Sequence, residues 1–381
     1  MPTTPTSIAN FYSVNFSPKP KTIGILGGGQ LGLMLAQAVL PLGIRCIFLE
    51  DAPNCPARLM GKVYSSEQFD DFAKACDCYT LEFENTPISL ATHLQQVSTI
   101  YPPPQALAVA QDRLQEKQLF NQLDITTVPF VAVHRYDDLV NACDKLGLPL
   151  VLKTSRGGYD GKGQMLIKTT DDLTKAWQAL GDSTNTAPLI AEGFIAFEKE
   201  VSIIAVRGQT GEIRYYPLIE NTHHQGILAQ SKAPALGVLH LNAQAQSNIK
   251  KLLEHFDYVG VMTLELFVTK DGLVANEIAP RVHNSGHWSI EGAVCSQFEN
   301  HMRAVAGLPL GDTAIIKPAR LFNIIGTYPD MDKVLSLDGV HLHLYDKQER
   351  AGRKLGHITV MPDNEAVCQT VIELLKPEAC R

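Results

Sequence analysis

The chain has 381 residues, enough for two or three domains with substantial hydrophobic cores. Hydrophobic residues make up 45% and charged residues 19%, an ordinary globular composition that argues against disorder. The formal net charge is -7, and no apolar run approaches the ~20 residues that a membrane-spanning helix needs. We therefore expect neither a nucleic-acid partner nor membrane insertion. The 8 cysteines form no C-x-x-C pair, which favours reduced thiols in a cytoplasmic protein over disulfides or a zinc site.

Residues 1–20 are polar and contain neither an acidic residue nor an apolar h-region. We interpret them as a disordered lead-in, because a secretion signal requires that apolar segment. An organelle transit peptide is the alternative. The folded part of the chain is thus expected to begin near residue 21.

A strand–loop–helix–strand pattern opens the folded part. Residues 22–26 and 44–49 are short apolar runs typical of buried parallel strands, and residues 33–40 have helical character. Residues 27–32 read GGGQLG, which satisfies G-x-G-x-x-G, and Glu50 ends the next strand. On its own this pattern suits an NAD oxidoreductase. A single match is weak, however, because the same loop could hold a simple phosphate or only pack the helix against the sheet.

A second glycine-rich segment, residues 157–164, reads GGYDGKGQ and follows an apolar strand predicted over residues 148–154. Glycines let backbone N–H groups approach phosphates, and Lys153 interrupts the apolar strand, where a lysine usually has a reason. The Walker signature is absent. We interpret the segment as a phosphate-binding loop, with a flexible surface hairpin as the alternative. A helix is predicted before it, over residues 108–123.

Residues 261–280 are predicted to form a β-hairpin that carries two carboxylates. A three-residue loop at residues 270–272 would place Glu265 directly opposite Glu277, and like charges in that position need a bridging group. Mg²⁺ typically takes one or two carboxylates together with substrate phosphates, and Asn276 adds an amide oxygen. A two-residue turn at residues 271–272 would instead direct the carboxylates apart into solvent. The spacing alone leaves both arrangements open.

Two polar clusters follow the hairpin. Arg281, His283 and Asn284 lie in a predicted loop, and these residue types can surround a small planar anion. Residues 347–354 concentrate positive charge in an otherwise acidic chain and suit a substrate phosphate. A solvated turn is the alternative for this second cluster.

The motifs GGGQLG, EFEN, GGYDGKGQ, EVS, ELF, NEIAPRVHNSGHW and GRKLGH occur in an order that resembles the ATP-grasp enzymes, and among them the 5-(carboxyamino)imidazole ribonucleotide synthase family. The resemblance spans residues 22–360. It implies an α/β and α+β chain: a Rossmann-like N-terminal domain that binds the ribonucleotide (21–110), an ATP-grasp domain (111–310) and a small β-rich C-terminal domain (311–381).

The resemblance also implies the activity. Such enzymes carboxylate 5-aminoimidazole ribonucleotide in de novo purine synthesis, using bicarbonate and ATP through a carboxyphosphate intermediate and releasing ADP and phosphate. Mg²⁺, or alternatively Mn²⁺, is the implied cofactor, and a cytoplasmic homodimer is the implied assembly.

Site residues carry over by motif. ATP would contact Arg113, Lys153, a flexible lid formed by Gly158, Tyr159, Asp160, Gly161, Lys162, Gly163 and Gln164, the strand residues Glu192, Gly193, Phe194 and Ile195, and Glu200, His223, Asn276 and Glu277. The ribonucleotide would contact Gln30, Leu31, Glu82, Lys347, Arg353 and Lys354. Glu265 and Glu277 would hold the metal, and Arg281, His283 and Asn284 would form the catalytic set that cradles bicarbonate.

Three other functions compete with this one. A formate-using transformylase of the same superfamily shares the first glycine loop and the carboxylate pair, but GGYDGKGQ and VHNSGHW argue against it. An NAD oxidoreductase leaves the second glycine loop and the carboxylates unexplained. A nucleotide sensor without turnover would be expected to lack the carboxylates, and both are present.

Overall fold

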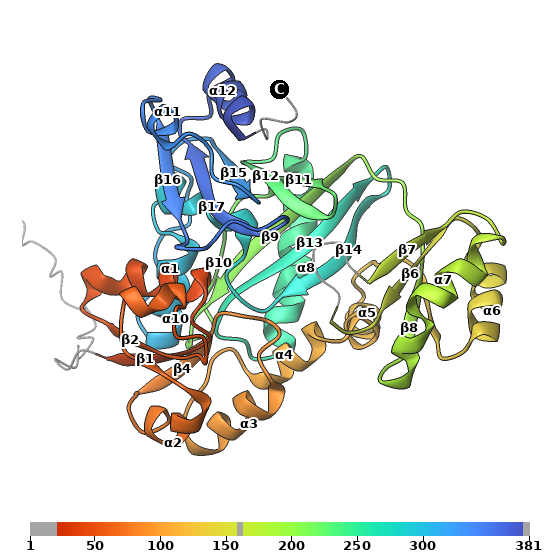
Figure 1. The fold of residues 1–381 in the computed structure, drawn as a ribbon, viewed down its shortest axis with the longest axis horizontal. Coiled ribbons are helices and arrows are strands. Elements are labelled where there is room, and N and C mark those ends of the chain that lie inside the picture. The colour runs from red at the N-terminus through yellow and green to blue at the C-terminus, as the bar shows by residue number, and fades with distance from the viewer. Residues whose placement is uncertain (1–20, 158–162, 376–381) are drawn as a thin grey trace, which may run out of the picture.

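The computed structural model describes residues 21–157 and 163–375, and in this part the strands form three sheets (Figure 1). An N-terminal four-stranded sheet, a central nine-stranded sheet and a second four-stranded sheet are linked by helices. The mixture of parallel and antiparallel sheets with helices agrees with the predicted α/β and α+β class. No helix of this part is long and apolar enough to cross a membrane. Its seven cysteines are free thiols.

The N-terminal sheet is parallel, with strand order β3-β2-β1-β4. Its elements are β1 (Thr22–Leu26), α1 (Gln30–Val39), β2 (Arg45–Leu49), β3 (Val63–Tyr64), α2 (Phe69–Phe72), β4 (Cys78–Leu81) and α3 (Ile88–Val97). Helix α1 begins three residues before the predicted helical stretch. The reason is that Gly29 is already its N-cap, so the glycine loop leads directly into the first helical turn.

One helix was predicted over residues 108–123, and this prediction is wrong. The structure has two helices, α4 (Pro104–Ala110) and α5 (Arg113–Gln122). Asp112 separates them because its backbone is extended and its carboxylate accepts hydrogen bonds from the N–H groups of Leu114 and Gln115. A short acidic side chain in this position starts a new helix by satisfying its free donors.

The second four-stranded sheet is antiparallel, with order β5-β8-β6-β7. It consists of β5 (Phe130–Val133), β6 (Leu150–Thr154), β7 (Gln164–Ile167) and β8 (Leu189–Gly193), and it packs against α6 (Tyr136–Leu146) and α7 (Asp172–Leu180). This unit projects to one side of the molecule (Figure 1). The glycine-rich segment lies between β6 and β7, and its residues Gly158, Tyr159, Asp160, Gly161 and Lys162 fall outside the described residues.

The central sheet has the order β14-β13-β9-β11-β12-β15-β17-β16, and β10 also pairs with β9. Its strands are β9 (Lys199–Arg207), β10 (Ile213–Tyr215), β11 (Ile219–His224), β12 (Ile227–Ala233), β13 (Gly260–Thr269), β14 (Gly272–Ala279), β15 (Ala319–Ile325), β16 (Val340–Leu344) and β17 (Lys354–Val360). Helices α8 (Asn242–His255) and α10 (Gln297–Ala306) pack against β9 and β13. The remaining helices are α9 (Ser289–Gly292), α11 (Met331–Leu335) and α12 (Glu365–Leu375).

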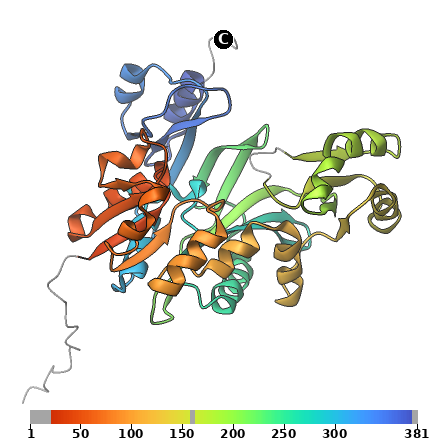
Figure 2. The ribbon, with the colours of Figure 1, turned by 60° about the horizontal axis from the view of Figure 1, so that its bottom comes forward.

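The C-terminal strands continue the central sheet, because residues 319–322 of β15 pair with residues 230–233 of β12. The predicted small C-terminal unit therefore shares a sheet with the residues before it, and the boundaries at residues 110 and 310 stay predictions. Figures 1 and 2 show this unit beside the N-terminal sheet, away from the unit of β5 to β8. An ion pair between Arg58 and Asp346, 2.7 Å apart, joins the two.

The hairpin of β13 and β14 differs from its prediction in the turn. Thr269 pairs with Gly272 across a two-residue turn, so neither the three-residue loop nor the turn at residues 271–272 is correct. A bulge then shifts the register between Leu264 and Leu266. Because β14 carries one extra residue there, Asn276 and Glu277 together face Glu265.

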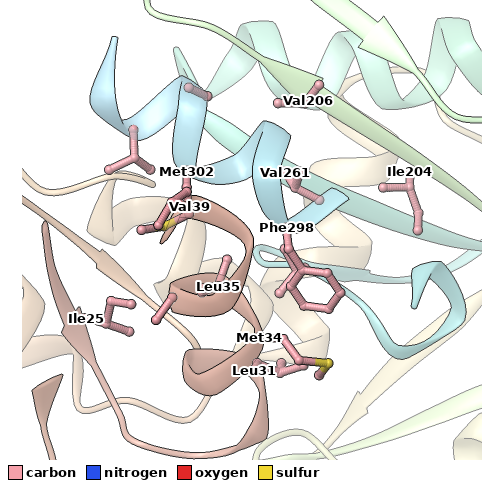
Figure 3. Packing of buried hydrophobic residues seen from close by; sticks show 14 of the residues in the cluster. Ile25, Leu31, Met34, Leu35, Val39, Ile204, Val206, Val261, Phe298 and Met302 are labelled. Atoms are coloured by element: carbon pink, nitrogen blue, oxygen red, sulfur yellow. The ribbon is translucent and has the colours of Figure 1, made fainter. Parts of the chain in front are cut away.

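The N-terminal unit and the central sheet share one hydrophobic core (Figure 3). Leu31, Leu35 and Val39 of α1 belong to the same buried cluster as Phe298 and Met302 of α10. This shared core fixes the glycine loop at the start of α1 relative to the strands that carry the carboxylates.

We therefore expect Phe298→Ala to lower the free energy of unfolding by about 3–5 kcal/mol, since it removes a ring that is only 1% exposed from this core. Leu335→Ala is the control, because Leu335 is 64% exposed. Denaturant-induced unfolding measures both. A Phe298→Ala loss no larger than that of the control would contradict a core shared between the two units.

Candidate active site

The first glycine loop is closed by the protein's own carboxylates. Glu82, just after β4, accepts hydrogen bonds from the backbone N–H of Gly29 at 2.7 Å and of Gly32 at 2.9 Å. Glu50 accepts one from Gly28 at 3.2 Å. A Cβ on Gly29 would lie 2.7 Å from the Glu82 carboxylate, so glycine is what permits this approach. The N–H groups at the start of α1, which would bind a dinucleotide phosphate, are therefore already used.

A group of buried ionisable side chains surrounds the carboxylate hairpin. Burial and the nearby charge of Glu265 raise the pKa of Glu277. Burial opposes ionisation of Glu265 too, but the neighbouring His283, together with the positive charges of His223 and Lys354, outweighs it and lowers the pKa of Glu265 to about 2. Glu116 of α5 is buried beside Glu277, and burial and that charge raise its pKa to about 8. The hairpin thus holds excess negative charge that a bound cation would relieve.

The donor set fits a hard cation that also uses substrate oxygens. Glu265, Glu277 and Asn276 supply carboxylate and amide oxygens on facing strands. In the described part of the chain, no three or more His, Cys, Asp or Glu side chains are grouped to hold a metal by themselves. Mg²⁺ typically takes only one or two carboxylates from the protein and completes its shell with substrate phosphates, which suits this small set of ligands.

Two of the three residues in the predicted catalytic set contact carboxylates. His283 Nε2 lies 3.0 Å from Glu265 Oε1. The Nε of Arg281 donates a hydrogen bond to Glu84 Oε2, and its Nη1 donates to the Val282 carbonyl. Glu84 follows Glu82 by two residues, so Arg281 is tied to the N-terminal unit. Its pKa is raised, since the charge of Glu84 outweighs the effect of burial.

Asn284 is held differently. It exchanges two hydrogen bonds with Asn323 of β15, at 3.0 and 2.7 Å. Asn323 also donates to the Leu228 carbonyl of the neighbouring strand. Both polar groups of the Asn284 amide are therefore engaged, which fixes the loop to the C-terminal strands.

The predicted ATP residues gather between the two sheets that flank α5. Lys153 of β6 donates a hydrogen bond to Glu192 of β8 at 2.7 Å, and Arg113 donates to the Thr154 carbonyl at 3.0 Å. Glu200 of β9 lies 2.6 Å from His223 of β11. Burial lowers the pKa of His223, but the adjacent Glu200 and the charge of Glu265 together outweigh it, so the net shift is upward. Gly163 directly precedes β7, and Gln164 is the first residue of that strand.

Two backbone N–H groups at the end of β8 are already engaged. The N–H of Gly193 donates to the Pro129 carbonyl and that of Phe194 to the Pro149 carbonyl. The Phe194 side chain is exposed, and Ile195 is partly buried.

The ribonucleotide residues divide into three environments. Lys347 donates a hydrogen bond to Gln30, which joins the C-terminal unit to the start of α1. Burial, followed by the positive charge of Arg353, lowers the pKa of Lys347 to about 8. The Leu31 side chain lies in the shared core, so its backbone is what faces the loop. Lys354 lies close enough to Glu265 for its charge to favour the ionised form of that carboxylate. Lys354 is therefore near the carboxylate hairpin.

Three charged residues at this site were missed in the sequence: Glu116 and Lys117, which are buried, and Glu84, which is partly buried. The Lys117 ammonium donates hydrogen bonds to Thr127 Oγ1 at 3.0 Å and to the Asn276 carbonyl at 2.8 Å. It lies 4.0 Å from Glu192. Its spacing of four from Arg113 on one helix was an available signal, because residues i and i+4 share a helix face.

The chain matches three descriptions of protein families along its length. Residues 20–111 match a ribonucleotide synthetase preATP-grasp domain, residues 118–298 an ATP-grasp domain, and residues 319–370 a phosphoribosylaminoimidazole carboxylase C-terminal domain. An N5-carboxyaminoimidazole ribonucleotide synthase of Pseudomonas aeruginosa is 45% identical, over 92% of this chain and 97% of the relative. One from Brucella melitensis is 46% identical, over 90% and 97%.

Solved structures agree with the fold. The N5-carboxyaminoimidazole ribonucleotide synthetase of Thermus thermophilus superposes with a TM-score of 0.87 at 46% identity, covering 92% of this chain and 97% of that one. The Aspergillus clavatus synthase, solved with ADP and 5-aminoimidazole ribonucleotide, gives a TM-score of 0.85 at 31% identity, covering 93% and 98%. The predicted ATP-grasp fold is confirmed, and the chain belongs to the N5-carboxyaminoimidazole ribonucleotide synthase family of ATP-grasp enzymes.

Proposed function

We propose that this chain uses ATP and bicarbonate to carboxylate 5-aminoimidazole ribonucleotide to its N5-carboxy derivative in purine biosynthesis, releasing ADP and phosphate. One observation carries the proposal beyond family membership. The loop of Arg281 and His283 touches Glu265 of the carboxylate hairpin and Glu84 of the N-terminal unit. An anion bound at this loop would lie between the ATP residues and the ribonucleotide residues, as a one-carbon donor must.

On the ATP side, we propose that Arg113 and Lys153 contact the phosphates and that Glu200 and His223 contact the ribose. Glu265, Glu277 and Asn276 would hold Mg²⁺, which supplies charge neutralisation to the transferred phosphoryl group. Lys117 contributes by fixing β14, since its ammonium bonds to the Asn276 carbonyl beside Glu277.

The chemistry follows from these positions. Bicarbonate attacks the γ-phosphate of ATP, which gives carboxyphosphate, and the exocyclic amine of the ribonucleotide then takes the carboxyl group. Arg281 and His283 orient the bicarbonate, and Arg113 and Lys153 stabilise the charge that develops on the phosphoryl oxygens. Because Asn284 is committed to Asn323, we assign it to holding the loop.

On the ribonucleotide side, we propose that Gln30 and Glu82 contact the sugar or base and that Lys347 and Arg353 contact the phosphate. The environment of Lys354, close to Glu265, suits a second contact to bicarbonate or carboxyphosphate as well. A cytoplasmic homodimer remains the proposed location and assembly, on the ground of family membership.

An NAD oxidoreductase is the poorer alternative. Its pyrophosphate would require the N–H groups of Gly29 and Gly32, and these donate to Glu82. A formate-using transformylase would use the same ATP residues, so the one-carbon donor separates it from our proposal.

The deciding experiment is ADP release by the purified protein with ATP, Mg²⁺, bicarbonate and 5-aminoimidazole ribonucleotide, added singly and together. We expect rapid release only with the full set. Carbonate-depleted buffer with formate restored in place of bicarbonate is the control. Rescue by formate and not by bicarbonate would replace our proposal with the transformylase.

Glu277→Gln should nearly abolish ADP release while leaving the melting temperature close to that of the parent. The change removes one anionic oxygen ligand, and loss of such a contact to a catalytic metal is worth several kcal/mol of transition-state stabilisation. Asp271→Asn, in the exposed turn of the same hairpin, is the matched control. Near-normal release by Glu277→Gln at low Mg²⁺ would remove Glu277 from the metal site.

The Michaelis constant for the ribonucleotide should rise as the pH passes through about 8. Lys347 carries its charge below its lowered pKa of about 8 and loses it above, so a phosphate contact weakens as the pH rises. Steady-state kinetics between pH 7 and 9 measures the effect (range chosen around that pKa). Lys347→Arg, charged throughout, should flatten the profile; an identical rise in that variant would exclude Lys347 as the cause.

A further inference from the structure

His283 lies at one end of a chain of buried polar side chains that crosses the central sheet. Ser285 Oγ lies 2.8 Å from His283 Nδ1 and 2.8 Å from Ser202 Oγ. Asn221 Nδ2 donates to Ser202 Oγ at 3.0 Å, and Ser231 Oγ donates to Asn221 Oδ1 at 2.9 Å. The three serines are 0% exposed and Asn221 is 7% exposed, so these contacts form away from bulk water.

The strand register explains how residues so far apart in sequence meet. Ser202 of β9 pairs with Glu265 of β13, and Asn221 of β11 pairs with Ser231 of β12. Paired residues of neighbouring strands project from the same face of a sheet. The loop from His283 to Ser285 crosses this face, because it reaches Glu265 through one residue and Ser202 through the other.

The direction of every hydrogen bond in the chain can be worked out from one donor. The backbone N–H of Ser285 can only donate, and it donates to His283 Nδ1 at 3.3 Å. Nδ1 therefore carries no hydrogen, and the neutral ring carries its proton on Nε2. The Ser285 hydroxyl must then donate to Nδ1 and accept from Ser202. The Ser202 hydroxyl in turn accepts from Asn221, which agrees with the direction of that bond.

We propose that Ser285, Ser202, Asn221 and Ser231 are positioning residues that hold His283 as the Nε2–H tautomer. The imidazole then presents a donor, and not a base, on the side that faces Glu265. This inference rests on the proposed function for its catalytic meaning: an N–H attracts the oxygens of bicarbonate, whereas a ring lone pair in the same place would repel them.

The contact of Ser285 with Nδ1 is needed because Nε2, on the opposite side of the ring, faces a carboxylate that has a second role. Glu265 Oε1 lies 3.0 Å from Nε2 in this structure, and Glu265 is also a candidate ligand of the metal. A contact on Nδ1 that involves no substrate or metal keeps the tautomer independent of what Glu265 binds. Along the chain, each hydroxyl donates to the neighbour nearer His283, and Ser285 and Ser202 also accept from the neighbour on the other side. Reversing one of these hydrogen bonds would leave a buried donor or acceptor without a partner.

The tautomer can be observed directly by nitrogen NMR of the full-length protein labelled with ¹⁵N-histidine. The His283 signals are identified by their loss in His283→Gln. We expect an Nε2–H ring whose Nδ1 resonance is that of a hydrogen-bonded, unprotonated nitrogen. Ser285→Ala should move this resonance towards that of an unprotonated nitrogen with a weaker hydrogen bond, because only the backbone N–H of residue 285 then donates to it. Ser202→Ala should move it in the same direction by a smaller amount. An Nδ1–H ring in the parent protein overturns the inference, as does an unmoved resonance in both variants.

Kinetics supplies the second readout. The Ser202 hydroxyl reaches His283 through Ser285, so Ser202→Ala should lower kcat by about tenfold and raise the Michaelis constant for bicarbonate, leaving that for ATP unchanged. Ser231→Ala, at the far end, should have the smallest effect of the series. Thr313→Val is the matched control, because Thr313 is buried but donates only to the Tyr215 carbonyl, outside the chain.

The two proposals fail separately. If the parent protein releases no ADP in response to bicarbonate and ribonucleotide, the proposed function fails while the NMR result still reports the tautomer. If ADP release is normal and kcat in both Ser202→Ala and Ser285→Ala stays within twofold of the control, the positioning role fails while the function stands. Equal changes in the Michaelis constants of ATP and bicarbonate would indicate general damage and also overturn it.

Discussion

The burial of like charges on the hairpin of β13 and β14 is the constraint on which the rest of the site depends. Glu265 and Glu277 face each other across a bulge and are partly buried, and the fully buried Glu116 lies close to Glu277. Such an arrangement is costly unless cations or donors surround it. Three elements around the hairpin supply such groups: the following loop supplies His283, α5 supplies Lys117 and Arg113, and the second sheet supplies Lys153.

The same constraint separates the roles of otherwise similar carboxylates. His283 keeps Glu265 ionised, whereas the charge of Glu265 disfavours ionisation of Glu277. Glu192, between Lys117 and Lys153, has its pKa lowered by those lysines in spite of burial. Glu265 and Glu192 are thus kept ionised by neighbouring basic side chains, whereas the negative charge of Glu277 is not fully neutralised by the protein. A bound cation would neutralise it, as a site for a cation and phosphates requires.

The segment from Glu82 to Glu84 joins this charged centre to the N-terminal unit. Glu82 closes the glycine loop by accepting from Gly29 and Gly32, and Glu84 binds Arg281. Because only one residue separates Glu82 from Glu84, a displacement of one is expected to move the other. The segment therefore couples the loop at the start of α1 to Arg281. The buried cluster shared by α1 and α10 holds the N-terminal unit against the central sheet, and so fixes the position of this loop relative to that sheet.

The sequence by itself determined the family, the order of the domains and the identity of most charged groups at the site, because motifs such as GGYDGKGQ and APRVHNSGHW lie in contiguous stretches of chain. It could not determine the turn and bulge that set Glu265 against Asn276 and Glu277, since strand register depends on packing across the sheet. Nor could it show that Glu82 fills the first glycine loop, that Lys117 is buried under β14, or that Ser202 and Ser231 support His283. These contacts join residues 10 to 159 positions apart, and only the tertiary structure, by pairing their strands and helices, brings their polar atoms within hydrogen-bonding distance.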